Sequence, residues 1–157
     1  LLRARVRATS DSGSEKQQSM ALVRLGAFLV SVEQHEEAEG LLIQALDLSF
    51  AEAQESDAGP WHVQVNLALA IAGQGRFEEA EGILQESAQW LLEHGEALAA
   101  LKGMGSPETV GDVLQANVDF YAAWHAAKPG KGHDAKAASW QTKLNAWNAK
   151  RKPVKSK

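Results

Sequence analysis

The sequence predicts an all-α fold, a solenoid of about three antiparallel helix pairs whose last pair is degenerate and caps the array. The stretch 36–42, Glu-Glu-Ala-Glu-Gly-Leu-Leu, returns with one change as 78–84, Glu-Glu-Ala-Glu-Gly-Ile-Leu, an offset of 42 residues. Around both copies the apolar residues recur at helical steps of three and four, and no segment gives a convincing strand. A repeat of this length indicates units that bury their apolar faces by stacking.

The composition is that of a globular domain. The chain has 157 residues, of which 45% are hydrophobic and 23% charged, so one domain with a real core is expected. Cysteine is absent, which excludes a disulfide framework, a thiol nucleophile and a zinc–thiolate site. No apolar run approaches the roughly 20 residues of a membrane span, so no membrane insertion is expected within the chain. Because it begins at Leu1 and in mid-pattern, we interpret it as a fragment of a longer protein.

Charge is distributed unevenly along the chain. The net charge is −4, although the last eight residues, 150–157, carry five positive charges. The rest is therefore strongly acidic, which argues against a broad nucleic-acid surface. We expect residues 150–157 to be a disordered, solubilising tail. A nuclear import signal, or weak nucleic-acid binding through this tail, is the alternative.

The first unit is expected at about 19–55. Residues 1–18 are interpreted as the end of a preceding helix followed by a polar loop at 9–18. A helix follows at about 19–32, with inward residues Leu22, Leu25, Phe28, Leu29 and Val32. After a turn at 33–35, a second helix runs to about Ala53, with inward residues Ala38, Leu41, Leu42, Ala45, Leu46 and Phe50.

The second unit is expected at about 60–95. Its first helix spans about 61–73, after a break that ends in Pro60, a residue suited to a first helical turn. A turn at 74–76 leads into a helix from Phe77 to about His94, with Gly95 as its C-terminal cap. In both units the acids of the repeated stretch are expected to cap the second helix, where they favour the positive end of its dipole, and to solvate it.

The third unit is expected at about 107–149. A helix at about 107–127 should bury Val110, Val113, Leu114, Val118, Tyr121 and Trp124. The break Lys128-Pro129-Gly130-Lys131-Gly132 precedes a last helix, which Asp134 caps and which ends near Lys150. Its inward residues are expected to be Ala137, Ala138 and Leu144, together with Trp140 and Trp147.

The helix pairs resemble tetratricopeptide repeats. In the first unit the motif positions hold Leu25-Gly26, Leu29, Ala38, Leu42 and Ala45; in the second they hold Leu67-Ala68, Ile71, Gly75, Phe77, Ala80 and Leu84. The 42-residue offset, with Asn66-Leu67-Ala68 before the turn and Ala80-Glu81 after it, resembles the kinesin-light-chain-like variety. Two positions depart from the pattern, because Glu33 replaces the usual turn glycine and His35 replaces an aromatic residue. An insertion around 128–133 also lengthens the last turn.

The third unit has a resemblance of its own. Tyr121-Ala122-Ala123-Trp124 and the stretch 136–144, Lys-Ala-Ala-Ser-Trp-Gln-Thr-Lys-Leu, are similar to the terminal repeat of bacterial tetratricopeptide proteins, many of which carry a serine/threonine kinase domain upstream. A regulatory or sensory C-terminal region of such a kinase is therefore one alternative function. The chain itself has no Gly-rich phosphate loop, His-Arg-Asp or Asp-Phe-Gly sequence, so it is not expected to be an enzyme.

Repeat arrays bind partners on a concave surface lined mainly by the first helix of each pair. The resemblance implies that Asn66 faces this groove and bonds a peptide backbone, since its amide both donates and accepts. Arg24, in the equivalent place one unit earlier, can pair with an acidic ligand side chain. The other expected lining residues are His62, Val65, Leu69 and Gly73, with Ala27 and Ser31 one unit earlier, and Asp112, Gln115 and Asp119 in the last unit. For each of them a plain solvated surface residue is the competing interpretation.

The remaining polar and aromatic residues do not indicate a cofactor. His35 and Glu39 have metal-ligand spacing, but the second histidine of a zinc-protease helix is missing, and no metal is expected. His125 and His133 flank the turn 128–132 and are interpreted as solvated loop histidines. The five tryptophans are interpreted as packing residues rather than a nucleotide-stacking platform.

These observations predict a non-catalytic scaffold, in the cytoplasm, that binds a protein or peptide ligand along its groove. No small-molecule substrate and no cofactor are expected.

Overall fold

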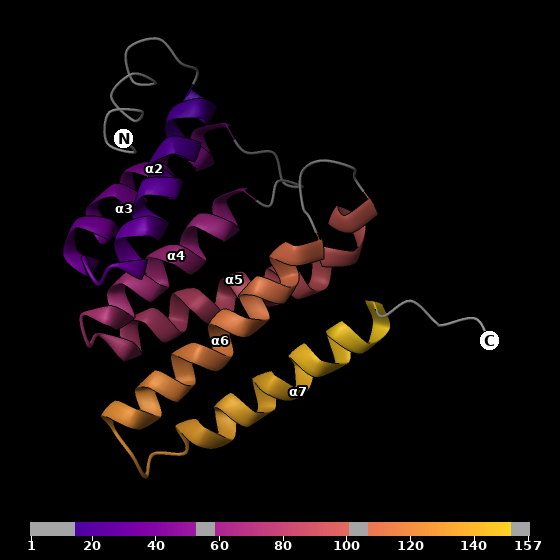
Figure 1. The fold of residues 1–157 in the computed structure, drawn as a ribbon. Helices are drawn as coiled ribbons and strands as arrows, with labels where there is room; N and C mark the ends of the chain where they lie inside the picture. Colours follow the sequence, from indigo (N-terminus) through magenta and orange to yellow (C-terminus); the bar gives the residue numbers. More distant parts are fainter. Residues whose placement is uncertain (1–14, 53–58, 101–106, 152–157) are drawn as a thin grey trace.

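The computed structural model describes residues 15–52, 59–100 and 107–151, which form six α-helices and no strand (Figure 1). The helices are α2 (Glu15–Ser31), α3 (His35–Glu52), α4 (Gly59–Gly73), α5 (Phe77–Ala100), α6 (Pro107–Ala127) and α7 (His133–Arg151). The all-α prediction is confirmed. The expected preceding helix at 1–8 and the end of the basic tail, 152–157, lie outside the described residues. None of the described helices has the length and apolar character needed to cross a membrane.

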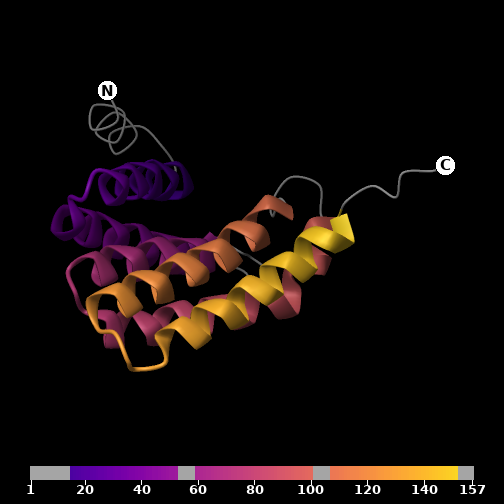
Figure 2. The ribbon, with the colours of Figure 1, turned by 60° about the horizontal axis from the view of Figure 1, so that its bottom comes forward.

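The helices pack as three consecutive pairs, α2 with α3, α4 with α5, and α6 with α7 (Figures 1 and 2). A short turn joins the two helices of each pair, so that they run antiparallel. The first helices are also neighbours of one another, because α4 packs against both α2 and α6. The central helix α4 is consequently buried on several sides. Its own buried residues are Val63, Val65, Leu67, Ala68, Ala70 and Ile71.

Small residues allow the helices of a pair to approach closely. A Cβ atom added to Gly26 on α2 would lie 2.6 Å from Cγ of Leu42 on α3, a distance at which the leucine would have to move. Ala38, Ala68 and Ala80 are fully buried. Each of these residues stands at a motif position of the repeat given above, and helices that pack this closely need small side chains there.

The turns inside the first two pairs have the same hydrogen bonds. The Gln34 amide donates to the Leu29 carbonyl at 2.9 Å and the Glu33 amide to the Val30 carbonyl at 3.1 Å. Gly75 and Arg76 repeat both bonds 42 residues later, to Ala72 at 2.8 Å and Ile71 at 3.3 Å. This is the Schellman arrangement, which needs a left-handed residue after the helix. Glu33 has φ of 60° and Gly75 has φ of 80°, so the two positions are equivalent in structure.

One carboxylate of the repeated stretch joins the first pair to the second. Arg76, in the turn between α4 and α5, donates from Nη1 to both carboxylate oxygens of Glu39 at 2.9 and 2.8 Å. Gln74 Nε2 donates to the same carboxylate at 2.5 Å. The hydrogen bond from Gln74, followed by that from Arg76, holds the pKa of Glu39 below its usual value, although burial opposes the shift.

The equivalent carboxylate, Glu81, joins the second pair to the third. Its Oε1 accepts from Lys136 Nζ at 2.7 Å and from the Tyr121 hydroxyl at 2.7 Å. Burial raises the pKa of Glu81, but the hydrogen bonds from Lys136 and Tyr121 outweigh it and leave the pKa below its usual value. The prediction that all acids of the stretch cap and solvate a helix is therefore wrong for Glu39 and Glu81, which bind the following unit.

Aromatic side chains fill the same two junctions between pairs. Phe77 stacks on Trp124 with ring centroids 5.6 Å apart. At the equivalent place in the first pair, the ring of His35 lies directly against Gly73, where a Cβ atom would clash with it. His35 thus takes the place of the aromatic residue that the repeat pattern would put there. His133 also stacks on Trp124, at a centroid distance of 3.9 Å, and is buried, so it is not the solvated loop histidine that was expected.

Three predicted helix boundaries differ from the structure. Helix α2 already includes residues 15–18, which were assigned to a loop, and α5 continues through Gly95 to Ala100. Glycine lowers helix propensity by only about 1 kcal/mol, which neighbouring favourable residues offset. Helix α7 begins at His133, so Asp134 lies in its first turn and does not precede it.

The inward face was misjudged at several positions. Phe28 and Val32 were expected in the core but are 48% and 45% exposed. Ala138 is exposed and Ala137 is only partly buried. The side of α7 that packs against the core is formed mainly by Leu144, Trp140 and Trp147. Two residues of α6 that were not predicted, Asn117 and Phe120, are buried.

Candidate functional site

The exposed sides of α2, α4 and α6 form one surface, which we call the first-helix face. It consists of Met20, Arg24, Phe28 and Ser31 on α2, His62, Asn66 and Leu69 on α4, and Asp112, Gln115 and Asp119 on α6. These residues follow steps of three and four, as one side of a helix must. All of them are exposed except Asn66 and Leu69, which are partly buried. Since α4 packs against both α2 and α6, the three stripes belong to neighbouring helices.

Asn66 is partly buried on α4, the central helix of this face, and its amide nitrogen is already engaged. Its Nδ2 donates to the backbone carbonyl of His62, one turn earlier, at 3.0 Å. Among the described residues no hydrogen bond reaches its Oδ1. The side chain can therefore accept a peptide N–H without any change, and donate its second amide hydrogen.

Three of the predicted lining residues lie on α2. Arg24 is exposed and pairs with no carboxylate among the described residues. Ser31 is exposed, and its hydroxyl donates to the Phe28 carbonyl at 2.7 Å. Ala27 is partly buried between these positions.

Two predicted lining residues have packing roles. Val65 is 5% exposed and belongs to the core, because α4 is enclosed by helices on both sides and only a narrow stripe of it reaches solvent. Gly73 is exposed, but its α-carbon supports the ring of His35. Its role is to let α3 approach α4, so it is a packing residue rather than a lining residue.

Sequence reasoning missed the two large apolar side chains of the face. Met20 and Phe28 are each 48% exposed, and with Arg24 they are spaced four residues apart on α2. Phe28 was assigned to the core. Its spacing of four residues from exposed Arg24 was the signal that could have placed it on the exposed side of α2. An exposed aromatic residue beside exposed polar residues is typical of interaction surfaces.

Electrostatics link α4 to α6 on this face. The pKa of His62 is lowered, because the surrounding protein partly removes water from its imidazole. The carboxylate of Asp112 acts in the opposite direction, which places an acid of α6 near the histidine of α4. The face thus carries a cation on α2 and the acids Asp112 and Asp119 on α6.

No metal site forms in the part of the chain that the structure describes, where no group of three or more His, Cys, Asp or Glu side chains could hold an ion. The two candidates from sequence have other partners: Glu39 binds Arg76 and Gln74, and His35 packs on Gly73. The Nδ1 atom of His125 lies 3.8 Å from Oδ1 of Asp134 across the α6–α7 turn.

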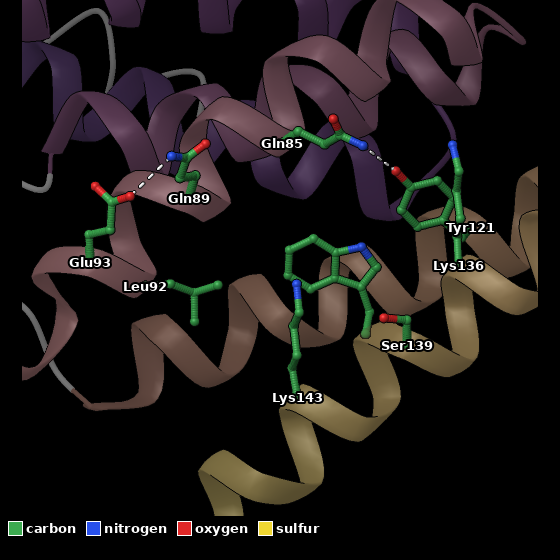
Figure 3. A pocket seen from close by; sticks show the side chains of 9 residues that line it. Gln85, Gln89, Leu92, Glu93, Tyr121, Lys136, Ser139 and Lys143 are labelled. Atoms are coloured by element: carbon green, nitrogen blue, oxygen red, sulfur yellow. Dashed lines mark hydrogen bonds between the residues drawn. The ribbon is translucent and has the colours of Figure 1, made fainter.

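A second feature was not predicted at all. A cleft of about 570 Å³ lies between α5 and α7, above Tyr121 of α6 (Figure 3). It is lined by Gln85, Gln89, Leu92, Glu93, Tyr121, Lys136, Ser139, Trp140 and Lys143. The sequence signal was the spacing of Lys136, Trp140 and Lys143, which puts all three on one side of α7.

The comparisons with known proteins add no family to this description. No protein family matches the chain. No curated protein is significantly similar to it.

Proposed function

We propose that this chain is a tetratricopeptide-type array that acts as a non-catalytic protein-interaction module and binds a peptide of its partner along the first-helix face. The observation that carries the proposal is the composition of that face. Exposed Met20 and Phe28 lie about one helical turn on either side of exposed Arg24 on α2, and Asn66 lies on the neighbouring helix α4. The opposite sides of the same helices are buried. Apolar contact area next to a few polar anchors is what a peptide-binding surface requires.

The distribution of charge indicates how the peptide lies. Arg24 on α2 attracts an acidic residue of the ligand. Asp112 and Asp119 on α6 attract a basic residue of the ligand. Neighbouring helix axes are about 8–10 Å apart, so the two charges lie roughly 20 Å from one another. An extended peptide covers that distance in about six residues. Asn66 lies midway and contacts the peptide backbone.

The proposal is tested with a peptide selected from a displayed random library on the full chain. Asn66→Ala should weaken the peptide's affinity at least about fivefold, because one anchoring hydrogen bond is lost, and leave helicity and melting unchanged. Asn148→Ala, which removes an exposed asparagine of α7, is the matched control and should bind normally. Unchanged affinity in Asn66→Ala would overturn the assignment of this site.

A further inference from the structure

The cleft between α5 and α7 arises because these second helices do not pack on each other. Both pack on α6, whose buried Tyr121 forms the floor at the end of the cleft near Gln85 and Lys136 (Figure 3). The α5 wall extends from Gln85 to Glu93 and the α7 wall from Lys136 to Lys143. Each wall is therefore about two helical turns long.

The polar groups at the floor are already satisfied by one another. The Tyr121 hydroxyl donates to Glu81 at 2.7 Å and accepts from Gln85 Nε2 at 2.8 Å. Lys136 Nζ also donates to Glu81, at 2.7 Å. A ligand would find few free hydrogen-bonding groups there, so recognition depends on the walls.

The walls carry one apolar side chain each, and the α7 wall adds a cation. Leu92 on α5 is 38% exposed, and Trp140 on α7 is partly buried. The Lys143 ammonium lies 3.8 Å from the centroid of the Trp140 ring, which fixes its position by a cation–π contact. Among the described residues Lys143 has no carboxylate partner. Lys150 is exposed on the same side of α7, seven residues further on.

The openness of the cleft decides the class of ligand. Seven of the nine lining residues are solvent-exposed, so the cleft is a trough rather than an enclosed cavity. Small-molecule sites bury most of their ligand, and this trough cannot. A rod that lies between two helices, touching both walls over two turns, fits it better.

We propose that the α5–α7 cleft is a second docking site, which takes an acidic amphipathic helix of a partner protein. An apolar side chain of that helix enters between Leu92 and Trp140. Carboxylates seven residues apart, about 10.5 Å along a helix, reach Lys143 and Lys150, which have the same spacing. Glu93, whose carboxylate accepts from Gln89 at 3.0 Å, repels acids and so directs them to the α7 wall. This site is separate from the first-helix face and does not depend on the function proposed for it.

The probe is a fluorescein-labelled synthetic helix about 20 residues long, a length at which an isolated helix can form. It has leucines at helical spacing and glutamates seven residues apart beside them, and its binding to the full chain is followed by fluorescence anisotropy. We expect Lys143→Glu to reduce affinity at least about tenfold and Leu92→Glu to do the same. The same helix with lysines in place of its glutamates should bind Lys143→Glu better than it binds the wild type.

Two variants outside the cleft serve as matched controls. Lys131→Glu changes an exposed lysine in the α6–α7 turn, and Ile43→Glu changes an exposed isoleucine of α3 that is 45% exposed. Both should bind the acidic helix like the wild type, with unchanged circular dichroism. The proposal is overturned if the acidic helix does not bind, or if Lys143→Glu binds it no worse than Lys131→Glu does. It is also overturned if sedimentation shows that the chain self-associates and that Lys143→Glu dissolves the oligomer, because a second copy would then be the occupant.

Discussion

At the scale of single residues, Glu33 carries the clearest unfavourable feature of the described backbone. It adopts φ of 60° at a turn position where its equivalent, 42 residues later, is Gly75. A side chain in the left-handed region costs roughly 1 kcal/mol relative to glycine. Glu33→Gly should therefore raise the free energy of unfolding by about 0.5–1 kcal/mol, measured by urea denaturation.

The reverse change at the equivalent turn is the control for that prediction. Gly75→Ala should lower the free energy of unfolding by about 1 kcal/mol, because alanine then takes the left-handed conformation. A Cβ atom at Gly75 meets nothing within 4 Å, so the effect is one of backbone conformation alone. If Glu33→Gly left the denaturation midpoint unchanged, the two turns would not be equivalent in energy.

The sequence identified the small residues at helix contacts, but it did not always identify which side of a helix is buried. Gly26, Ala38 and Ala80 were assigned to motif positions of the repeat, and at these positions close helix contacts leave no room for larger side chains. Phe28 was placed in the core because helical periodicity fixes a direction only to within about a third of a turn. Its equivalent in the second pair, Ala70, is fully buried. The difference depends on which helix lies beside each position, and the repeat alone does not contain that information.

At the scale of helices and their junctions, the repeated stretch does more than mark the start of the second helix in the first two pairs. Its third acid, Glu39 in one copy and Glu81 in the other, accepts hydrogen bonds from the following unit at both junctions. The sequence could not show this, since the partners differ. They are an arginine and a glutamine at the first junction, and a lysine and a tyrosine at the second, where the partners come from both α6 and α7.

The two carboxylates predict how stability depends on pH. Both have a pKa lowered by folding, so their contribution is present above the unfolded value, near 4.5, and is lost as the pH falls through the folded value. Glu81→Gln should cost about 1 kcal/mol at neutral pH, the size of a partly screened charged hydrogen bond. It should also reduce the loss of stability between about pH 5 and pH 3.

The measurement is urea denaturation at several pH values in that range. Glu86→Gln, a change of an exposed glutamate on α5, is the control and should leave the pH profile of the wild type unaltered. A Glu81→Gln profile parallel to that of the wild type would show that the carboxylate does not hold the second and third pairs together.

At the scale of the whole molecule, the sequence predicted three helix pairs and their order, because the repeat and the helical period act within each unit. It did not predict the cleft between α5 and α7. That opening depends on how the third pair is set against the second, which contacts remote in sequence determine. Lys128 reaches Glu78 at 2.9 Å and Lys136 reaches Glu81 at 2.7 Å, and neither pair has a counterpart at the 42-residue offset.

The molecule thus presents two surfaces of different composition on different helices. The first-helix face on α2, α4 and α6 has one arginine, several polar groups and two exposed apolar residues. The cleft on α5 and α7 has lysines, a tryptophan and a leucine. The two surfaces share only α6, whose Tyr121 lines the cleft, so a ligand is located by its effects on α2 and α4 or on α5 and α7.

The central claim is that the first-helix face binds the partner peptide. Backbone amide chemical shifts of the isotope-labelled chain, recorded during titration with the library-selected peptide, test it most directly. The account predicts that the largest changes fall on α2, α4 and α6, around Arg24, Asn66 and Asp112, and that they shrink in Asn66→Ala. Changes confined to α3, α5 and α7, or to the basic residues after Lys150, would contradict it.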